Sequence, residues 1–150
     1  AKSFGGGMPL GAFISSKEHM SKLTFDPPLG HITTFGGHPV SCAAGLAAQQ
    51  VIEQDGLMEH AMRMEGIYRR GLKHPLIHSI RGKGLFLAVV LNDGVDVGRF
   101  ISKAFENQLV IDQFLFSKNS FRIAPPLIIT EDEVKESIQG VLTTLHGMMK

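Results

Sequence analysis

The sequence predicts an α/β protein, with a compact α+β unit from about residue 76 onward and an earlier part that forms the edge of something larger. Residues 85–91 have the length and apolar composition of a buried strand. Apolar residues at helical spacing occur on both sides of this strand. Charged residues make up only 19% of the chain, below the roughly 25% of a typical soluble domain, which indicates extra buried surface such as an oligomer interface.

The first part of the chain is predicted to contain a short strand over 11–15 and an irregular stretch over 24–38. Pro39 fits the first turn of a helix, because its missing N–H is not needed there. The helix should cover 40–54, with small alanine side chains that permit close packing. Asp55 and Gly56 interrupt it, and a second helix is predicted over 57–72.

The second part should add an amphipathic helix over 96–108 and short strands at 109–111, 114–116 and 121–123. Thr130 and Glu133 form a capping-box pattern, in which each side chain satisfies a backbone donor of the other residue. This pattern predicts the start of a last helix whose inward face is Val134, Ile138, Val141, Leu142 and Leu145.

Composition limits the classes of function. A net charge of +1 gives no electrostatic case for nucleic-acid binding. The single cysteine, Cys42, excludes an internal disulfide and fits a reducing compartment, which we expect to be the cytoplasm or, in a eukaryote, the mitochondrial matrix. Its apolar helical context predicts a small buried side chain. No apolar run reaches the ~18 residues of a membrane span.

Lys2 precedes three consecutive glycines and a Met-Pro-Leu-Gly turn. Glycine is costly to order and is kept where backbone turns sharply or approaches something closely. A lysine withdrawn from water there would become a nucleophilic amine suited to a carbonyl cofactor. A surface lysine beside a flexible glycine loop is the alternative. A nucleotide-binding loop is a weaker one, because the Gly-Lys-Ser/Thr ending is missing.

Thr33 and Thr34 lie beside Gly36 and Gly37, just before the predicted helix at Pro39. Two hydroxyls, backbone N–H groups and a helix N-terminus would together make a phosphate clamp. An ordinary helix cap with a glycine turn is the competing interpretation.

Arg122 lies in a strongly apolar run, where a guanidinium needs an anionic partner. A carboxylate suits its bidentate fork, and could come from a substrate or from a structural ion pair. His74 and His78 have the spacing of a helical zinc pair, but Pro75 makes a helix there unfavourable, so we expect no metal site.

Together these runs resemble the class III, ornithine-aminotransferase-like family of pyridoxal-phosphate enzymes. The resemblance covers essentially the whole chain, as that family's C-terminal part, and rests on four motifs in the family's order: Lys-x-x-Gly-Gly-Gly-x-Pro-Leu-Gly-Ala from Lys2, Thr-Thr-Phe-Gly-Gly-x-Pro from Thr33, Arg-Gly-x-Gly-Leu from Arg81, and Arg-x-Ala-Pro-Pro-Leu-Ile-Ile from Arg122. His38 stands where the family usually has Asn.

The resemblance implies the C-terminal portion of a fold-type I pyridoxal-phosphate-dependent transferase. Residues 1–56 would be a remnant of the large cofactor-binding domain and the start of the linking helix. Residues 57–150 would be the linking helix and the small α+β domain. The chain would then be a C-terminal piece of a longer, homodimeric protein that carries pyridoxal 5'-phosphate, with the remaining cofactor contacts upstream.

The resemblance also implies residue roles. Lys2 would be the catalytic lysine linked to the cofactor, Thr33 and Thr34 would hold the cofactor phosphate of the neighbouring subunit, and Arg122 would bind a substrate carboxylate or pair with a glutamate. The reaction would move an amino group from an ω-amino donor such as ornithine or acetylornithine to a 2-oxo acid. Another class III activity, such as 4-aminobutyrate transamination, and a non-catalytic α+β or dimerisation module are the alternatives.

Overall fold

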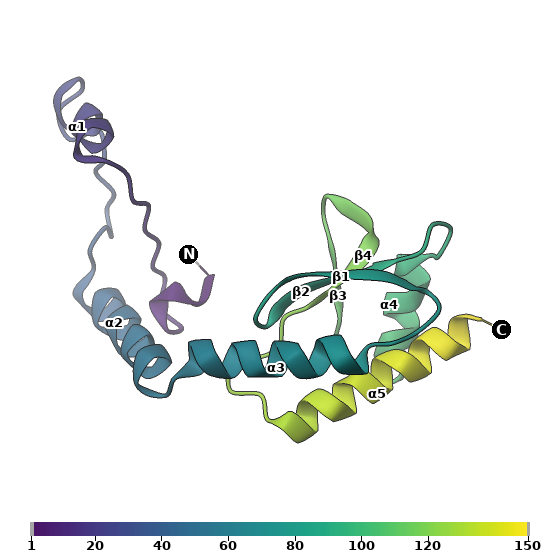
Figure 1. Cartoon of the computed structure of the whole chain (residues 1–150). Helices are drawn as coiled ribbons and strands as arrows, with labels where there is room; N and C mark the ends of the chain where they lie inside the picture. Colours follow the sequence, from purple (N-terminus) through teal and green to yellow (C-terminus); the bar gives the residue numbers. More distant parts are fainter. Residues whose placement is uncertain (1, 150) are drawn as a thin grey trace. The chain divides into compact units, whose positions relative to one another are not determined.

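The computed structural model describes residues 2–149 and divides into two compact units, 1–55 and 56–150 (Figure 1). The first unit contains a short 3₁₀ helix and two α-helices: η1 (Lys2–Gly5), α1 (Lys17–Phe25) and α2 (Pro39–Gln54). Ser16 caps α1 by accepting a hydrogen bond from the backbone N–H of His19 at 3.3 Å.

The predicted strand over 11–15 is wrong. These residues have no regular structure, and no strand of the first unit lies within the described residues to pair with them. A strand is stabilised by its partners, so a short apolar run alone does not specify one. Helix α1 was not expected, although the serine at its N-cap is a recognisable start signal.

The glycine run packs η1 against α2. A Cβ atom on Gly6 would lie 2.6 Å from the carbonyl oxygen of Ala44. On α2, a Cβ atom on Gly45 would lie 2.6 Å from Leu10 Cδ2 and 3.1 Å from the carbonyl oxygen of Phe4. Close approach is therefore the reason for these glycines, as predicted, but the groups approached are those of a neighbouring helix.

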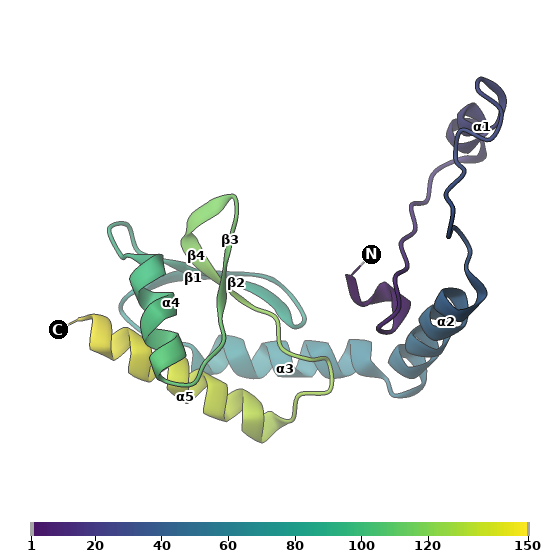
Figure 2. The ribbon, with the colours of Figure 1, turned by 180° about the vertical axis from the view of Figure 1, so that it is seen from behind.

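The second unit is a four-stranded antiparallel sheet with three helices (Figures 1 and 2). The strands lie in the order β1-β2-β4-β3. In chain order the elements are α3 (Leu57–Gly71), β1 (Ile77–Lys83), β2 (Phe86–Leu91), α4 (Val97–Glu106), β3 (Asp112–Phe114), β4 (Ser117–Ile123) and α5 (Glu131–Met148).

The core of this unit lies between the sheet and its helices. Figures 1 and 2 show α3 and α5 side by side, with α4 beside β3 and β4. Phe100 of α4 stacks on Phe121 of β4, with ring centroids 4.4 Å apart. The fully buried side chains include Met64, Tyr68, Leu87, Val89, Val134 and Leu145. Burial of these large apolar groups supplies most of the driving force for folding.

The predicted helices and the strand at 85–91 are confirmed, with ends displaced by one or two residues. Helix α5 begins where the capping box places it: Thr130 Oγ1 accepts from the Glu133 N–H, and the Glu133 carboxylate accepts from the Thr130 N–H at 2.7 Å. The strand predicted at 121–123 is the end of the longer β4.

Three predictions for this part of the chain and for α2 are corrected. Residues 109–111 are not a strand. Of the strand predicted at 114–116, only Phe114 belongs to a strand, as the last residue of β3, and residues 115–116 form the turn into β4. The apolar pattern did not predict strand β1, because polar residues such as His78 and Arg81 interrupt it. Cys42 is exposed on α2 rather than buried.

A hydrogen-bonded ion pair holds the β1–β2 hairpin to α3. The Glu65 carboxylate accepts from Arg69 Nε at 2.7 Å and from the Gly84 N–H at 2.6 Å. Arg69 also donates to the carbonyls of Ile80 and Gly82, at 2.7 and 2.9 Å. The hydrogen bond from Arg69, and then that from Gly84, hold the pKa of Glu65 below its ordinary value despite its burial. The Arg-Gly-x-Gly-Leu motif thus has a visible structural role.

Candidate functional site

Lys2 is the first residue of η1 and its side chain is exposed. Its backbone has φ +60°, in the left-handed region that non-glycine residues rarely adopt. The following turn is fixed by hydrogen bonds from the Gly6 N–H to the Ser3 carbonyl and from the Met8 N–H to the Gly5 carbonyl, both 3.0 Å. The amine is therefore carried by a segment that is packed on α2 rather than by a loose glycine loop.

Thr33 and Thr34 lie in the loop before α2, and both are exposed. The Gly36 N–H donates to the Thr33 carbonyl at 3.3 Å, and a Cβ on Gly36 would lie 2.5 Å from Thr33 Oγ1. The absence of a side chain at Gly36 thus leaves room for the Thr33 hydroxyl. Neither threonine caps the helix, so the helix-cap interpretation is wrong.

The N-terminus of α2 has no side-chain cap within the described residues. His38 is the N-cap residue and makes no side-chain hydrogen bond, and Pro39 occupies the first turn. The first-turn N–H groups of a helix point outward and carry a partial positive charge. Backbone donors at the start of a 16-residue helix and two nearby hydroxyls fit a phosphate group.

Arg122 projects from β4 opposite Asp112 of β3 and forms an ion pair with it. Its neighbours Phe121 and Ile123 are buried, whereas the Arg122 side chain is 35% exposed. Side chains alternate between the two faces of a strand, so an apolar run can still place its charged member outside the core. The anionic partner expected for Arg122 is therefore Asp112, in an ion pair within the protein, and the arginine lies outside the core.

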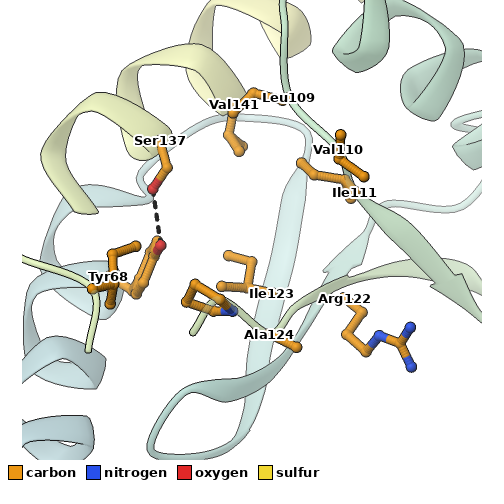
Figure 3. Close-up of a pocket in the computed structure, with 11 residues that line it drawn as sticks. Tyr68, Leu109, Val110, Ile111, Arg122, Ile123, Ala124, Ser137 and Val141 are labelled. Carbon is orange, nitrogen blue, oxygen red and sulfur yellow. Dashed lines mark hydrogen bonds between the residues drawn. The ribbon is translucent and has the colours of Figure 1, made fainter. Parts of the chain in front are cut away.

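The stem of Arg122 borders a pocket of about 140 Å³ that Figure 3 shows in close-up. The Tyr68 hydroxyl and Ser137 Oγ are hydrogen bonded at 2.8 Å in this pocket, and burial raises the pKa of Tyr68. Arg122 points away from this pair. The other lining residues are mostly apolar: Leu109, Val110, Ile111, Ile123, Ala124, Pro125, Ile129 and Val141.

The site residues predicted from sequence fall in both units. Lys2, Thr33 and Thr34 belong to the first unit and Arg122 to the second. Sequence reasoning missed Asp112, because its pairing with Arg122 depends on the register of β3 and β4. Among residues 2–149, no group of three histidine, cysteine or acidic side chains could hold a metal ion. The same residues include no helix with the length and apolarity needed to cross a membrane.

Comparisons with known proteins agree with this pattern of motifs. The family model described as aminotransferase class III matches residues 1–145. An acetylornithine aminotransferase of Caldanaerobacter subterraneus is 38% identical over 144 residues, which are 93% of this chain and 35% of that protein. The chain therefore spans about a third of the length of this relative.

Solved structures give the same result for the fold. The acetylornithine aminotransferase of Elizabethkingia anophelis superposes with a TM-score of 0.71 at 31% identity, over 78% of this chain and 32% of that one. An ornithine aminotransferase of Toxoplasma gondii superposes with a TM-score of 0.72 at 31% identity, over 87% of this chain and 32% of that one. Its active site contains partially occupied pyridoxal phosphate.

The fold is that of a portion of the fold-type I pyridoxal-phosphate-dependent transferases. The chain belongs to the class III aminotransferase family, whose members use pyridoxal phosphate.

Proposed function

We propose that this chain is the C-terminal part of a homodimeric, pyridoxal-phosphate-dependent aminotransferase. Its donor would be an ω-amino compound such as ornithine or acetylornithine, and its acceptor a 2-oxo acid. The family match over residues 1–145 and the 38% identity to an acetylornithine aminotransferase support this proposal. The single cysteine supports a reducing compartment, and we place the enzyme in the cytoplasm.

The observation that carries the proposal is Lys2 at the start of a glycine turn that is packed against α2. Catalysis by a lysine requires its amine to be held close to the productive geometry. Bound pyridoxal phosphate supplies an aldehyde that attaches amines and a ring that withdraws electrons from them. In this setting Lys2 would hold the cofactor until the substrate amine displaces it. The released Lys2 amine would then take the proton from the substrate Cα as general base and give it, as general acid, to the cofactor carbon that carried the aldehyde.

Thr33, Thr34 and the uncapped start of α2 would hold the phosphate of the partner subunit's cofactor. The exposed hydroxyls make no protein hydrogen bond within the described residues, so they can donate to an oxyanion. This role would make the homodimer necessary for full cofactor affinity. The low charged fraction of the chain supports an interface of this kind.

Arg122 would bind a substrate carboxylate. Its side chain is partly exposed on the sheet, and a guanidinium matches the geometry of a carboxylate better than a lysine amine does.

A donor panel tests the activity. The full-length protein, supplied with pyridoxal phosphate and 2-oxoglutarate, should form glutamate from ornithine or acetylornithine faster than from 4-aminobutyrate. A preference for 4-aminobutyrate would move the protein to another class III activity, and no glutamate from any of the three donors would contradict the proposal.

A further inference from the structure

The pocket in Figure 3 has the size and lining of a site for a small neutral molecule. All of its lining residues belong to the second unit. Its volume of about 140 Å³ is close to that of dry apolar cavities of about 150 Å³ that hold a benzene ring. Of the lining residues only Arg122 is charged, and its guanidinium points away from Tyr68 and Ser137 (Figure 3). An ion would lose its hydration in this pocket without gaining a partner of opposite charge.

Two hydroxyl groups give the pocket a fixed hydrogen-bonding polarity. Ser137 Oγ donates its single hydrogen to the carbonyl of Val134 at 2.8 Å. The 2.8 Å hydrogen bond between Ser137 and the Tyr68 hydroxyl must therefore be donated by the tyrosine. The Tyr68 hydrogen is then in use, whereas the Tyr68 oxygen accepts no hydrogen bond from any residue that the structure describes. The pocket thus offers a ligand an acceptor and no hydroxyl donor.

The tyrosine that carries this acceptor is firmly held. Tyr68 is only 2% exposed and belongs to the core between the sheet and its helices. Burial raises the pKa of Tyr68, so its hydroxyl stays protonated at neutral pH and continues to donate to Ser137. An acceptor that is already in place loses little conformational freedom when a ligand binds.

We propose that this pocket binds a small neutral molecule that combines an apolar ring with one hydroxyl or N–H donor, of which phenol is the simplest example. The ring contacts the apolar lining, and the donor bonds to the Tyr68 oxygen. A ligand that carries only acceptors buries them without a partner, which lowers its affinity. The inference does not depend on the proposed transamination, because Lys2, Thr33 and Thr34 do not line the pocket.

The test follows the binding of phenol and toluene to the full-length holoenzyme by NMR of labelled isoleucine methyl groups. Toluene has the ring of phenol but no donor. Ile111, Ile123 and Ile129 line the pocket, whereas Ile52 of α2 does not and serves as the reference. Phenol should shift the signals of the three lining residues and leave that of Ile52 in place. No shift at the lining residues, or an equal shift at Ile52, would overturn the proposal.

The variant Tyr68→Phe keeps the aromatic ring and removes the acceptor. Loss of one hydrogen bond should raise the dissociation constant of phenol about 2- to 12-fold relative to that of toluene. If the dissociation constants of phenol and toluene change by the same factor, the requirement for a donor is refuted.

The variant Ser137→Ala tests the direction of the hydrogen bond independently, and it carries the test if Tyr68→Phe does not fold. Without Ser137 the Tyr68 hydrogen is free to bond to a ligand. Benzonitrile, which only accepts, should then bind about 2- to 12-fold tighter than to the wild type, relative to toluene as a measure of the enlarged pocket. Thr143→Ala removes an exposed hydroxyl elsewhere on α5 and should change nothing. No gain for benzonitrile in Ser137→Ala would refute the assigned polarity.

Discussion

Removal of the Thr34 hydroxyl should weaken cofactor binding without affecting the fold. Thr34 is exposed in the loop before α2 and does not cap that helix, so Thr34→Ala removes no protein contact seen in the structure. A hydrogen bond to a charged group is worth about 1.5–3 kcal/mol. This corresponds to a loss of cofactor affinity of roughly 10- to 150-fold.

The assay is titration of the full-length apoenzyme with pyridoxal phosphate, followed by absorbance. Thr24→Ala is the matched control, since Thr24 is also exposed but lies on α1. The control should bind the cofactor normally, and both variants should unfold at the temperature of the wild type. An unchanged dissociation constant for Thr34→Ala would refute the phosphate role and leave Thr34 as a loop residue.

Three other predictions concern folding and the isolated chain. Both carboxylate oxygens of Glu65 accept hydrogen bonds, so Glu65→Gln places its NH₂ group against either Arg69 Nε or the Gly84 N–H. This substitution should lower the unfolding free energy by about 1–3 kcal/mol at pH 7. Glu106→Gln, at an exposed position, is the control. Because the pKa of Glu65 is lowered in the folded state, the stability that its charge contributes is complete above the ordinary value of 4.5 and is lost as pH falls through the folded pKa. The difference in unfolding free energy between Glu65→Gln and the wild type, measured by urea unfolding, should therefore become smaller toward pH 3. A difference that does not change with pH would contradict the role of the charge. The isolated 150-residue chain should not transaminate ornithine, since it spans only 35% of the length of its relative, and measurable glutamate formation would contradict this. In the isolated chain, the backbone amides of α5 should exchange hydrogen more slowly than those of residues 1–38, because Val134, Val141 and Leu145 are buried in the core of the second unit. Slower exchange in residues 1–38 than in α5 would argue against a second unit that folds independently.

Features set by local chemistry could be predicted from the sequence. The capping box of α5 involves residues three positions apart, so Thr130 and Glu133 specify the helix start without reference to the rest of the fold. The apolar run of β2 is similarly informative, because four of its six residues, Leu87, Val89, Val90 and Leu91, are buried.

Features set by pairing between distant segments could not be predicted in the same way. Strand β1 is stabilised by its antiparallel pairing with β2 and by hydrogen bonds from Arg69 to the carbonyls of Ile80 and Gly82. The exposure of Arg122 and its partner Asp112 follow from strand alternation and register in the β3–β4 pair. The glycine run was recognised as a site of close approach, but only the structure shows that Gly6 approaches α2.

The most direct test of the central claim is to locate the lysine that carries the cofactor. The full-length holoenzyme would be reduced with borohydride, digested, and its peptides mapped by mass spectrometry. We predict a pyridoxyl label on Lys2, and no stable label after Lys2→Arg. A label on Lys17 of α1 or Lys83 of β1 instead would contradict the assignment of Lys2 as the catalytic residue.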